Sequence, residues 1–198
     1  HEMARLIASL HHADGGVAVE GFHDGAAPPT ERQRADTAAF PYDESAFFTD
    51  VGGSAHGETG YTARERVTLR PALDVNGLWG GYTGGGGKTI VPCEAQAKLT
   101  SRVVAGQDPA AVMQAVLRHL RRHCPAECTL DVIAITDGSP ASTLAPGHPL
   151  VRAAEAVLER ETGARPIHVR LGASVPVTSI FKEMLGIDTL MFGSNLPD

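Results

Sequence analysis

Two histidines four residues apart, followed closely by two cysteines, form the first group of residues that could do chemistry. His119 and His123 would share one face of a helix, and Cys124 and Cys128 follow directly. Spacing of this kind can hold zinc. Three arginines stand among these residues, however, and cations are favoured at the C-terminal end of a helix. The pattern therefore favours a solvated basic helix end, and we predict no metal site among the residues of this chain.

A glycine tract before a lysine suggests a phosphate-binding loop at Gly84–Lys88. The full pattern requires a glycine where Tyr82 stands, and it requires a helix directly after the lysine. An alternating, strand-like segment follows Lys88 instead. We therefore interpret the tract as a hairpin loop whose glycines allow close approach to a ligand. A phosphate-binding module that uses Lys88 is kept as an alternative.

Two further positions suit the binding of an anion. Arg102 lies on the polar face of a predicted strand, beside Lys98 and Thr100, and an arginine fork is suited to a carboxylate. Ser174 stands between a predicted strand and a helix, where it either contributes to an anion site or only caps the helix. The segment from Gly172 to Pro176 partly matches the Gly-x-Ser-x-Gly turn, or nucleophile elbow, that carries a catalytic serine in some hydrolases. Pro176 stands where that pattern requires its final glycine. We therefore predict no nucleophilic serine and no catalytic residue in this chain.

The elements that must position these residues follow from hydrophobic periodicity and capping residues. Thr30 is a suitable N-cap, and Asp108-Pro109 is a typical helix start. Apolar residues at spacings of three and four support the helices at 1–10 and 108–123. The predicted helices span 1–10, a stretch from 31, 44–50, 62–69, 108–123, 148–162 and a stretch from 175.

Alternating apolar and polar residues predict a pair of strands at 73–81 and 91–102. Shorter strands are expected at 17–22, 129–135, 166–170 and 189–192. The fold class is therefore α+β: residues 1–136 form a ferredoxin-like βαββαβ layer. Residues 137–198 are predicted to form an incomplete α/β portion of a second domain, because the alternating helices and strands from 148 onward span about fifty residues, too few for a parallel sheet.

Composition narrows the class of protein. The chain has 198 residues, a mass of 20.8 kDa and a net charge of −6, which argues against a nucleic-acid binder. No apolar run approaches the ~20 residues of a membrane span, and no leader precedes a cleavage site. Three cysteines are too few for a disulfide framework and fit reduced cytosolic thiols. We expect a soluble cytoplasmic protein with no nucleic-acid or membrane partner.

Several segments together resemble one family, the di-zinc exopeptidases. The resemblance rests on Leu73–Gly84, Lys88–Pro92, Lys98–Pro109, Arg170–Val177 and Phe192–Asp198. The first three are similar to the lid region of enzymes such as carnosine dipeptidase, glutamate carboxypeptidase and acetylornithine deacetylase, and the last two to late segments of their catalytic domain. The order is that of the family, and the dipeptidase branch is the most similar. The resemblance implies a lid and dimerisation domain at 1–136 and the C-terminal part of a catalytic domain at 137–198.

The resemblance also implies an activity and four substrate-binding positions. The parent protein would be a metallopeptidase with two zinc ions, a homodimer through its lid, acting on a small peptide or an N-acyl amino acid with a free C-terminal carboxylate. Arg102 would grip that carboxylate, Thr89 would contact the substrate near its scissile bond, Ser174 would bind substrate, and Asn76 would shape the lid.

The family's zinc ligands have no counterpart in this chain, so the chain alone is expected to be inactive. Leu171 also replaces a glutamate of the family pattern. The alternative is a stand-alone ferredoxin-like module that dimerises or binds a small ligand without catalysis.

Overall fold

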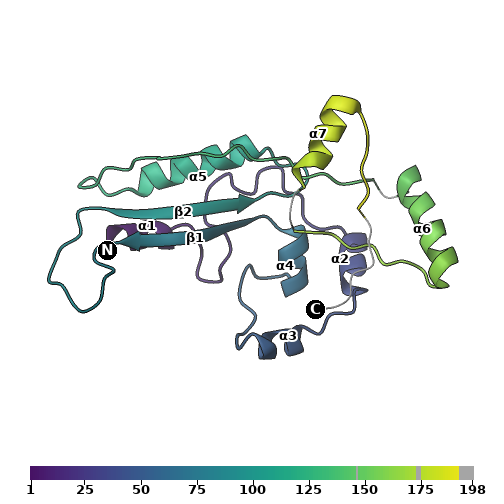
Figure 1. Cartoon of the computed structure of the whole chain (residues 1–198), viewed down its shortest axis with the longest axis horizontal. Coiled ribbons are helices and arrows are strands. Elements are labelled where there is room, and N and C mark those ends of the chain that lie inside the picture. The colour runs from purple at the N-terminus through teal and green to yellow at the C-terminus, as the bar shows by residue number, and fades with distance from the viewer. Residues whose placement is uncertain (146, 173–174, 192–198) are drawn as a thin grey trace.

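A computed structural model describes residues 1–145, 147–172 and 175–191 (Figure 1). The described part of the chain is a mixture of helices and one antiparallel hairpin, which confirms the predicted α+β class. The elements are α1 (Glu2–Ala8), α2 (Glu31–Ala38), α3 (Glu44–Asp50), α4 (Ala63–Leu69), β1 (Ala72–Gly80), β2 (Ala95–Arg102), α5 (Pro109–His123), α6 (Pro149–Thr162) and α7 (Pro176–Leu185). Helices are present in all of the segments where they were predicted.

Side-chain caps explain where several helices begin. Thr30 and Thr62 each form a capping box, with Gln33 and Glu65 respectively at the third helical position. Asp108 caps α5 by accepting a hydrogen bond from the backbone N–H of Ala110, and a proline follows it at the first helical position. At their C-terminal ends, α6 and α7 both stop at a glycine in the left-handed conformation.

The β1–β2 hairpin pairs Ala72 with Arg102 at one end and Gly80 with Ala95 at the other. The register shifts between Val75 and Gly77, so Asn76 occupies a β-bulge. The bulge reverses the alternation of β1 beyond that point. As a result Leu78 shares a face with Leu73 and Val75, and Trp79 is turned to the opposite face.

The core lies on one face of this hairpin. It is formed where α1, the segment after it, β1 and α5 meet, and Phe22 and Leu10 are fully buried at its centre. Figure 1 shows α5 running alongside the hairpin. The buried cluster consists of Leu10, Val17, Val19, Phe22, Leu73, Val112, Ala115 and Val116. Burial of these apolar side chains drives the packing of the helices on the sheet.

The shorter predicted strands are wrong. Residues 129–135 and 166–170 form no strand, and neither do the described residues of 189–192, of which residue 192 lies outside the described part. Residues 17–22 contribute only an isolated bridge between Val17 and His11. A strand exists only through its ladder, and in the described residues the only ladder is β1–β2. β2 also begins at Ala95, later than the predicted residue 91.

Helices α2, α3 and α4 gather near the end of the hairpin at which β2 stops, while the loop joining the two strands lies at the opposite end (Figure 1). This arrangement places α4 beside the end of β2 that carries Arg102. No helix in the described part of the chain is both long and apolar enough to cross a bilayer.

Candidate functional site

Arg102 is the last residue of β2, and its side chain is about half exposed, at 54%. The guanidinium has two partners. Its Nε lies 3.5 Å from Oδ2 of Asp74, and its Nη1 donates a hydrogen bond of 3.2 Å to the backbone carbonyl of Gly172. The arginine therefore joins the β1–β2 hairpin to a segment 70 residues further along the chain.

The sheet register explains why Asp74 reaches Arg102. Asp74 pairs with Thr100, which lies two residues before Arg102 on the same strand. Alternate residues of a strand share a face, so Asp74 is the diagonal neighbour of Arg102. The face opposite the core thus presents a carboxylate and a guanidinium at the end of the hairpin.

Gly172 is held against the last turn of α4. A Cβ at this position would overlap the backbone carbonyl oxygen of Val67, so only glycine fits the contact as it stands. The carbonyl of the same residue accepts the hydrogen bond from Arg102. The position of α4 therefore determines where the segment before Ser174 meets the arginine.

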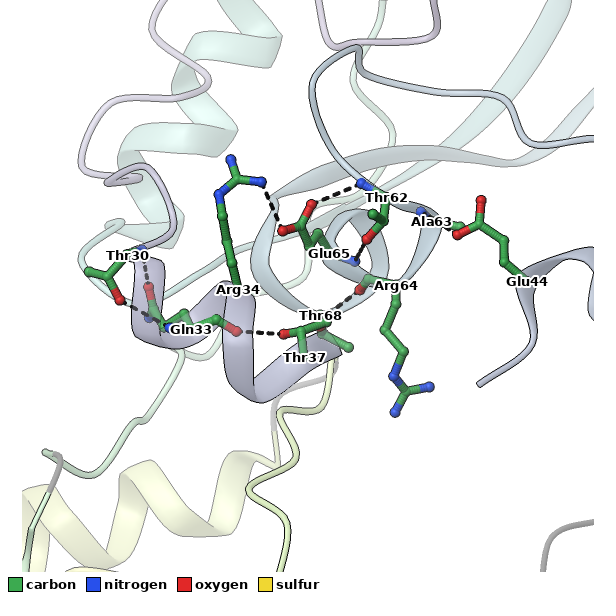
Figure 2. Close-up of polar contacts among 10 residues, drawn as sticks. All are labelled: Thr30, Gln33, Arg34, Thr37, Glu44, Thr62, Ala63, Arg64, Glu65 and Thr68. Atoms are coloured by element: carbon green, nitrogen blue, oxygen red, sulfur yellow. Dashed lines mark hydrogen bonds and ion pairs between the residues drawn. The ribbon is translucent and has the colours of Figure 1, made fainter. Parts of the chain in front are cut away.

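A buried carboxylate fixes the N-terminal end of α4 (Figure 2). Glu65 is only 5% exposed; its Oε2 accepts from the backbone N–H of Thr62 at 2.9 Å, and its Oε1 accepts from Nη1 of Arg34 at 2.8 Å. The adjacent N–H of Ala63 donates to Oε2 of Glu44 at 3.1 Å. These bonds satisfy amides that a helix start leaves free, and they tie α4 to α2 and α3.

A second ion pair anchors the chain directly after α4. Arg70 donates to both carboxylate oxygens of Glu58, at 2.7 and 2.8 Å, and these bonds raise the pKa of Arg70. Its Nη2 also lies 3.3 Å from Nδ1 of His23. Because arginine can only donate, the imidazole nitrogen is the acceptor in this contact. Both ends of α4 are thus held by charge-assisted bonds.

Thr89 lies in the exposed loop between the strands, beyond the Gly80–Ala95 end of the hairpin. The N–H of Ile90 donates to the carbonyl of Lys88 at 3.1 Å, which makes Thr89 the centre of a three-residue turn. Seven residue steps of β2 separate the two ends of the hairpin, or about 24 Å. Within one chain the structure therefore does not bring Thr89 and Arg102 together.

The other predicted site residues are distributed as follows. Asn76 is exposed in the β-bulge, midway along β1 and away from Arg102 in the register. Ser174 lies outside the described residues; it stands two positions after Gly172 and just before Val175, the residue that precedes α7. Sequence reasoning predicted α4 as a helix but missed the contacts that α4, Asp74 and Gly172 make around Arg102. Asp74 could have been found from strand alternation once the register was known, whereas the contact between Gly172 and α4 had no local signal.

The histidine and cysteine group does not form a metal site. In the described residues, no three His, Cys, Asp or Glu side chains lie where they could hold an ion. The rings of His119 and His123 stack at 4.0 Å, and Nε2 of His119 lies 3.0 Å from the Oγ of Ser9. Burial lowers the pKa of His119, and the neighbouring His123 lowers it further. The described residues therefore offer no set of ligands for zinc.

The glycine tract is an exposed loop. Lys88 is followed by irregular backbone and then β2, with no helix start that could bind a phosphate. Instead, the Nζ of Lys88 lies 4.9 Å from the ring centroid of Tyr82, whose hydroxyl donates to the carbonyl of Gly85 at 3.0 Å. These contacts fit the predicted hairpin loop.

The described residues form a two-stranded antiparallel layer with a long helix alongside it and an arginine at the end of β2. The family model of the M20 peptidase dimerisation domain matches residues 1–128. The chain belongs to this family. The resemblance to the exopeptidase family stated from the sequence is thereby confirmed.

Among curated proteins, the chain is 23% identical to the Cys-Gly metallodipeptidase DUG1 of Saccharomyces cerevisiae over 201 residues, which is 96% of the chain and 40% of that protein. It is also 23% identical to the Beta-Ala-His dipeptidase of Homo sapiens over 199 residues, 93% of the chain and 37% of the relative. The chain thus spans about 40% of the length of the curated relatives it matches.

Solved structures show the same fold. The M20 family metallo-carboxypeptidase Sso-CP2 from Sulfolobus solfataricus superposes with a TM-score of 0.77 at 27% identity, covering 93% of this chain and 42% of that one. Human carnosine dipeptidase 1 superposes with a TM-score of 0.73 at 21% identity, covering 93% and 40%. The second likeness concerns the fold alone.

Proposed function

We propose that the protein carrying this chain is a metal-dependent dipeptidase or related exopeptidase, which hydrolyses a peptide or amide bond next to a free C-terminal carboxylate. This chain supplies the lid at 1–136, a part of the catalytic domain at 137–198, and contacts to the substrate carboxylate. Two zinc ions are held by residues outside the chain. The proposal is supported by membership of the peptidase dimerisation family and by relatives named as metallodipeptidases and dipeptidases.

The observation that carries the proposal is the position of Arg102. Its guanidinium is exposed at the end of β2 and lies against the segment that leads into Ser174. The Nη1–Nη2 end of an arginine can bind a carboxylate through two parallel hydrogen bonds. Arg102 is the group we assign to the substrate carboxylate, and Ser174 is assigned as its neighbour in the same subsite.

The separation of Thr89 and Arg102 bears on the oligomeric state. A dipeptide spans only about 7 Å when extended, whereas about 24 Å of β2 lies between the two ends of the hairpin. If both residues contact one substrate, then Thr89 must come from a second copy of the chain. The proposal therefore includes a homodimer formed through the lid, in which each active site uses both protomers. The β-bulge at Asn76 shapes the hairpin whose loop carries Thr89 to the active site of the second protomer.

The remaining features of the proposal concern substrate and location. The substrate is a dipeptide or an N-acyl amino acid, since a single arginine suits one terminal carboxylate. A net charge of −6 disfavours nucleic acid. Cys93, Cys124 and Cys128 are unpaired thiols, which fits a cytoplasmic protein.

The test is the kinetics of Arg102→Ala in the full-length, metal-loaded protein. The substrates are a dipeptide with a free carboxylate and the same dipeptide as its C-terminal amide. Because Arg102 is half exposed, we expect a loss of about 2–3 kcal/mol in transition-state stabilisation for the free acid, which is roughly a 30- to 150-fold fall in kcat/KM. The amide should change little.

Arg122→Ala is the matched control, since this arginine forms only an exposed ion pair with Glu20 at 3.4 Å. It should leave both substrates unaffected. If Arg102→Ala leaves kcat/KM for the free acid unaltered, then Arg102 does not bind the substrate carboxylate. A full-length protein that dimerises but cleaves neither substrate would favour the stand-alone module.

A further inference from the structure

We infer that Asp74 is a positioning residue for Arg102: it holds the Nε edge of the guanidinium so that the opposite end faces the substrate carboxylate. The inference rests on the role proposed for Arg102 and adds a residue to that subsite. It comes from the contact between Oδ2 of Asp74 and Nε of Arg102 at 3.5 Å.

Two fixed groups determine the plane of the guanidinium. Asp74 stands at the Nε edge, and the carbonyl of Gly172 accepts one N–H of Nη1. A planar guanidinium has five N–H donors, and after these contacts both donors of Nη2 and one of the two on Nη1 remain. A substrate carboxylate can therefore bind at the Nη1–Nη2 end of the guanidinium. Asp74 already contacts the Nε edge, so the substrate does not bind there.

The two anchors are themselves well supported. Asp74 belongs to β1, and its place opposite Thr100 is fixed by the ladder. Gly172 is pressed on the backbone of Val67 in α4, whose N-terminal end is held by the buried Glu65. Neither anchor depends on the ligand, so Arg102 is oriented before substrate arrives.

This orientation matters because a half-exposed arginine on its own samples many rotamers. Fixing them beforehand lowers the entropy lost when the substrate carboxylate binds. The pair adds little to stability, since both side chains are more than half exposed, at 54% and 53%. Its effect is therefore expected in substrate binding and not in folding.

The experiment is Asp74→Asn in the full-length, metal-loaded protein, with the same free-acid and amide dipeptides. We expect KM for the free acid to rise about 5- to 10-fold with kcat within about twofold, because a neutral amide attracts the guanidinium less strongly than a carboxylate does. KM for the amide substrate should not change. Asp74→Glu keeps the charge and should recover part of the loss.

Two controls separate positioning from structure. Glu20→Gln removes a more exposed acid, at 92%, that pairs with Arg122 on another part of the surface, and it should leave KM unchanged. In the Arg102→Ala background, Asp74→Asn should cause no further rise in KM, because the group it positions is gone. The melting temperature of Asp74→Asn should match that of the wild type.

Three results would overturn the inference while leaving the role of Arg102 intact: a lower KM for the free acid in Asp74→Asn, which means that Asp74 competes with substrate; an unchanged KM; or an equal rise for the amide. A normal kcat/KM in Arg102→Ala is a different failure. It removes the proposed carboxylate subsite, and the inference falls with it.

Discussion

Glu65 offers the sharpest test of how α4 is held, because its carboxylate is buried and both of its oxygens are used (Figure 2). In Glu65→Gln, the side-chain oxygen can still accept the N–H of Thr62. The amide nitrogen then faces Arg34 as a second donor, so the ion pair is lost. The substitution therefore isolates the bond between α2 and α4 while it preserves side-chain volume.

The expected loss follows from the exposure of the two partners. A hydrogen bond to a charged group contributes about 1.5–3 kcal/mol. Arg34 is 41% exposed while the side chain of Glu65 is 7% exposed, so water screens one partner only. We expect Glu65→Gln to cost about 1–2 kcal/mol. Glu65→Ala also removes the acceptor for Thr62, which raises the cost to about 2–3 kcal/mol.

The assay is native-state hydrogen exchange of the α2 and α4 amides in the full-length protein, because the effect is local. A double-mutant cycle with Arg34→Gln measures the coupling between the two side chains. We expect Glu65→Gln to cost little once Arg34 has been replaced. Exchange rates in Glu65→Gln that match the wild type, or an equal cost in both backgrounds, would refute the reasoning.

Two pH dependences follow from the shifted pKa values. Hydrogen bonds from Gly16 and Thr59 lower the pKa of Asp14 from 3.8 to about 2, so the stability this carboxylate provides is present above pH 4 and lost as the pH falls towards 2. In Asp14→Asn, the free energy of unfolding, measured by urea unfolding at several pH values, should fall less between pH 4 and pH 2 than in the wild type. An equal fall in both proteins would show that Asp14 does not cause it. Burial lowers the pKa of His119 from 6.5, so stability should fall as the pH drops below about 6.5. An NMR titration should place the midpoint of His119 below 6.5, and a midpoint above it would contradict the buried, neutral imidazole.

Local signals in the sequence were sufficient to place the helices and the hairpin. Asp108 followed by proline marked the start of α5, and Thr30 marked the start of α2. Alternation over two long segments identified β1 and β2. These features depend on neighbours within a few residues, so the chain carries them without reference to its tertiary structure.

The features that could not be predicted depend on distant partners. Residues 129–135 were predicted as a strand, yet no strand among the described residues pairs with them. The bulge at Asn76 becomes visible only in the register with β2. Arg102 was predicted to bind an anion, and this role stays a prediction; its bond to Gly172 spans 70 residues and depends on where α4 lies. Sequence patterns therefore supplied the candidate arginine and not the residues that contact it.

The measurement that tests the account most directly is hydrolysis of a dipeptide and of its C-terminal amide by the full-length protein, before and after metal removal by a chelator. The account predicts that the free acid is cleaved much faster than the amide and that the chelator abolishes cleavage until metal is restored. Equal rates for the two substrates would contradict the carboxylate grip assigned to Arg102. Cleavage that persists without metal would contradict the assignment to a metallopeptidase.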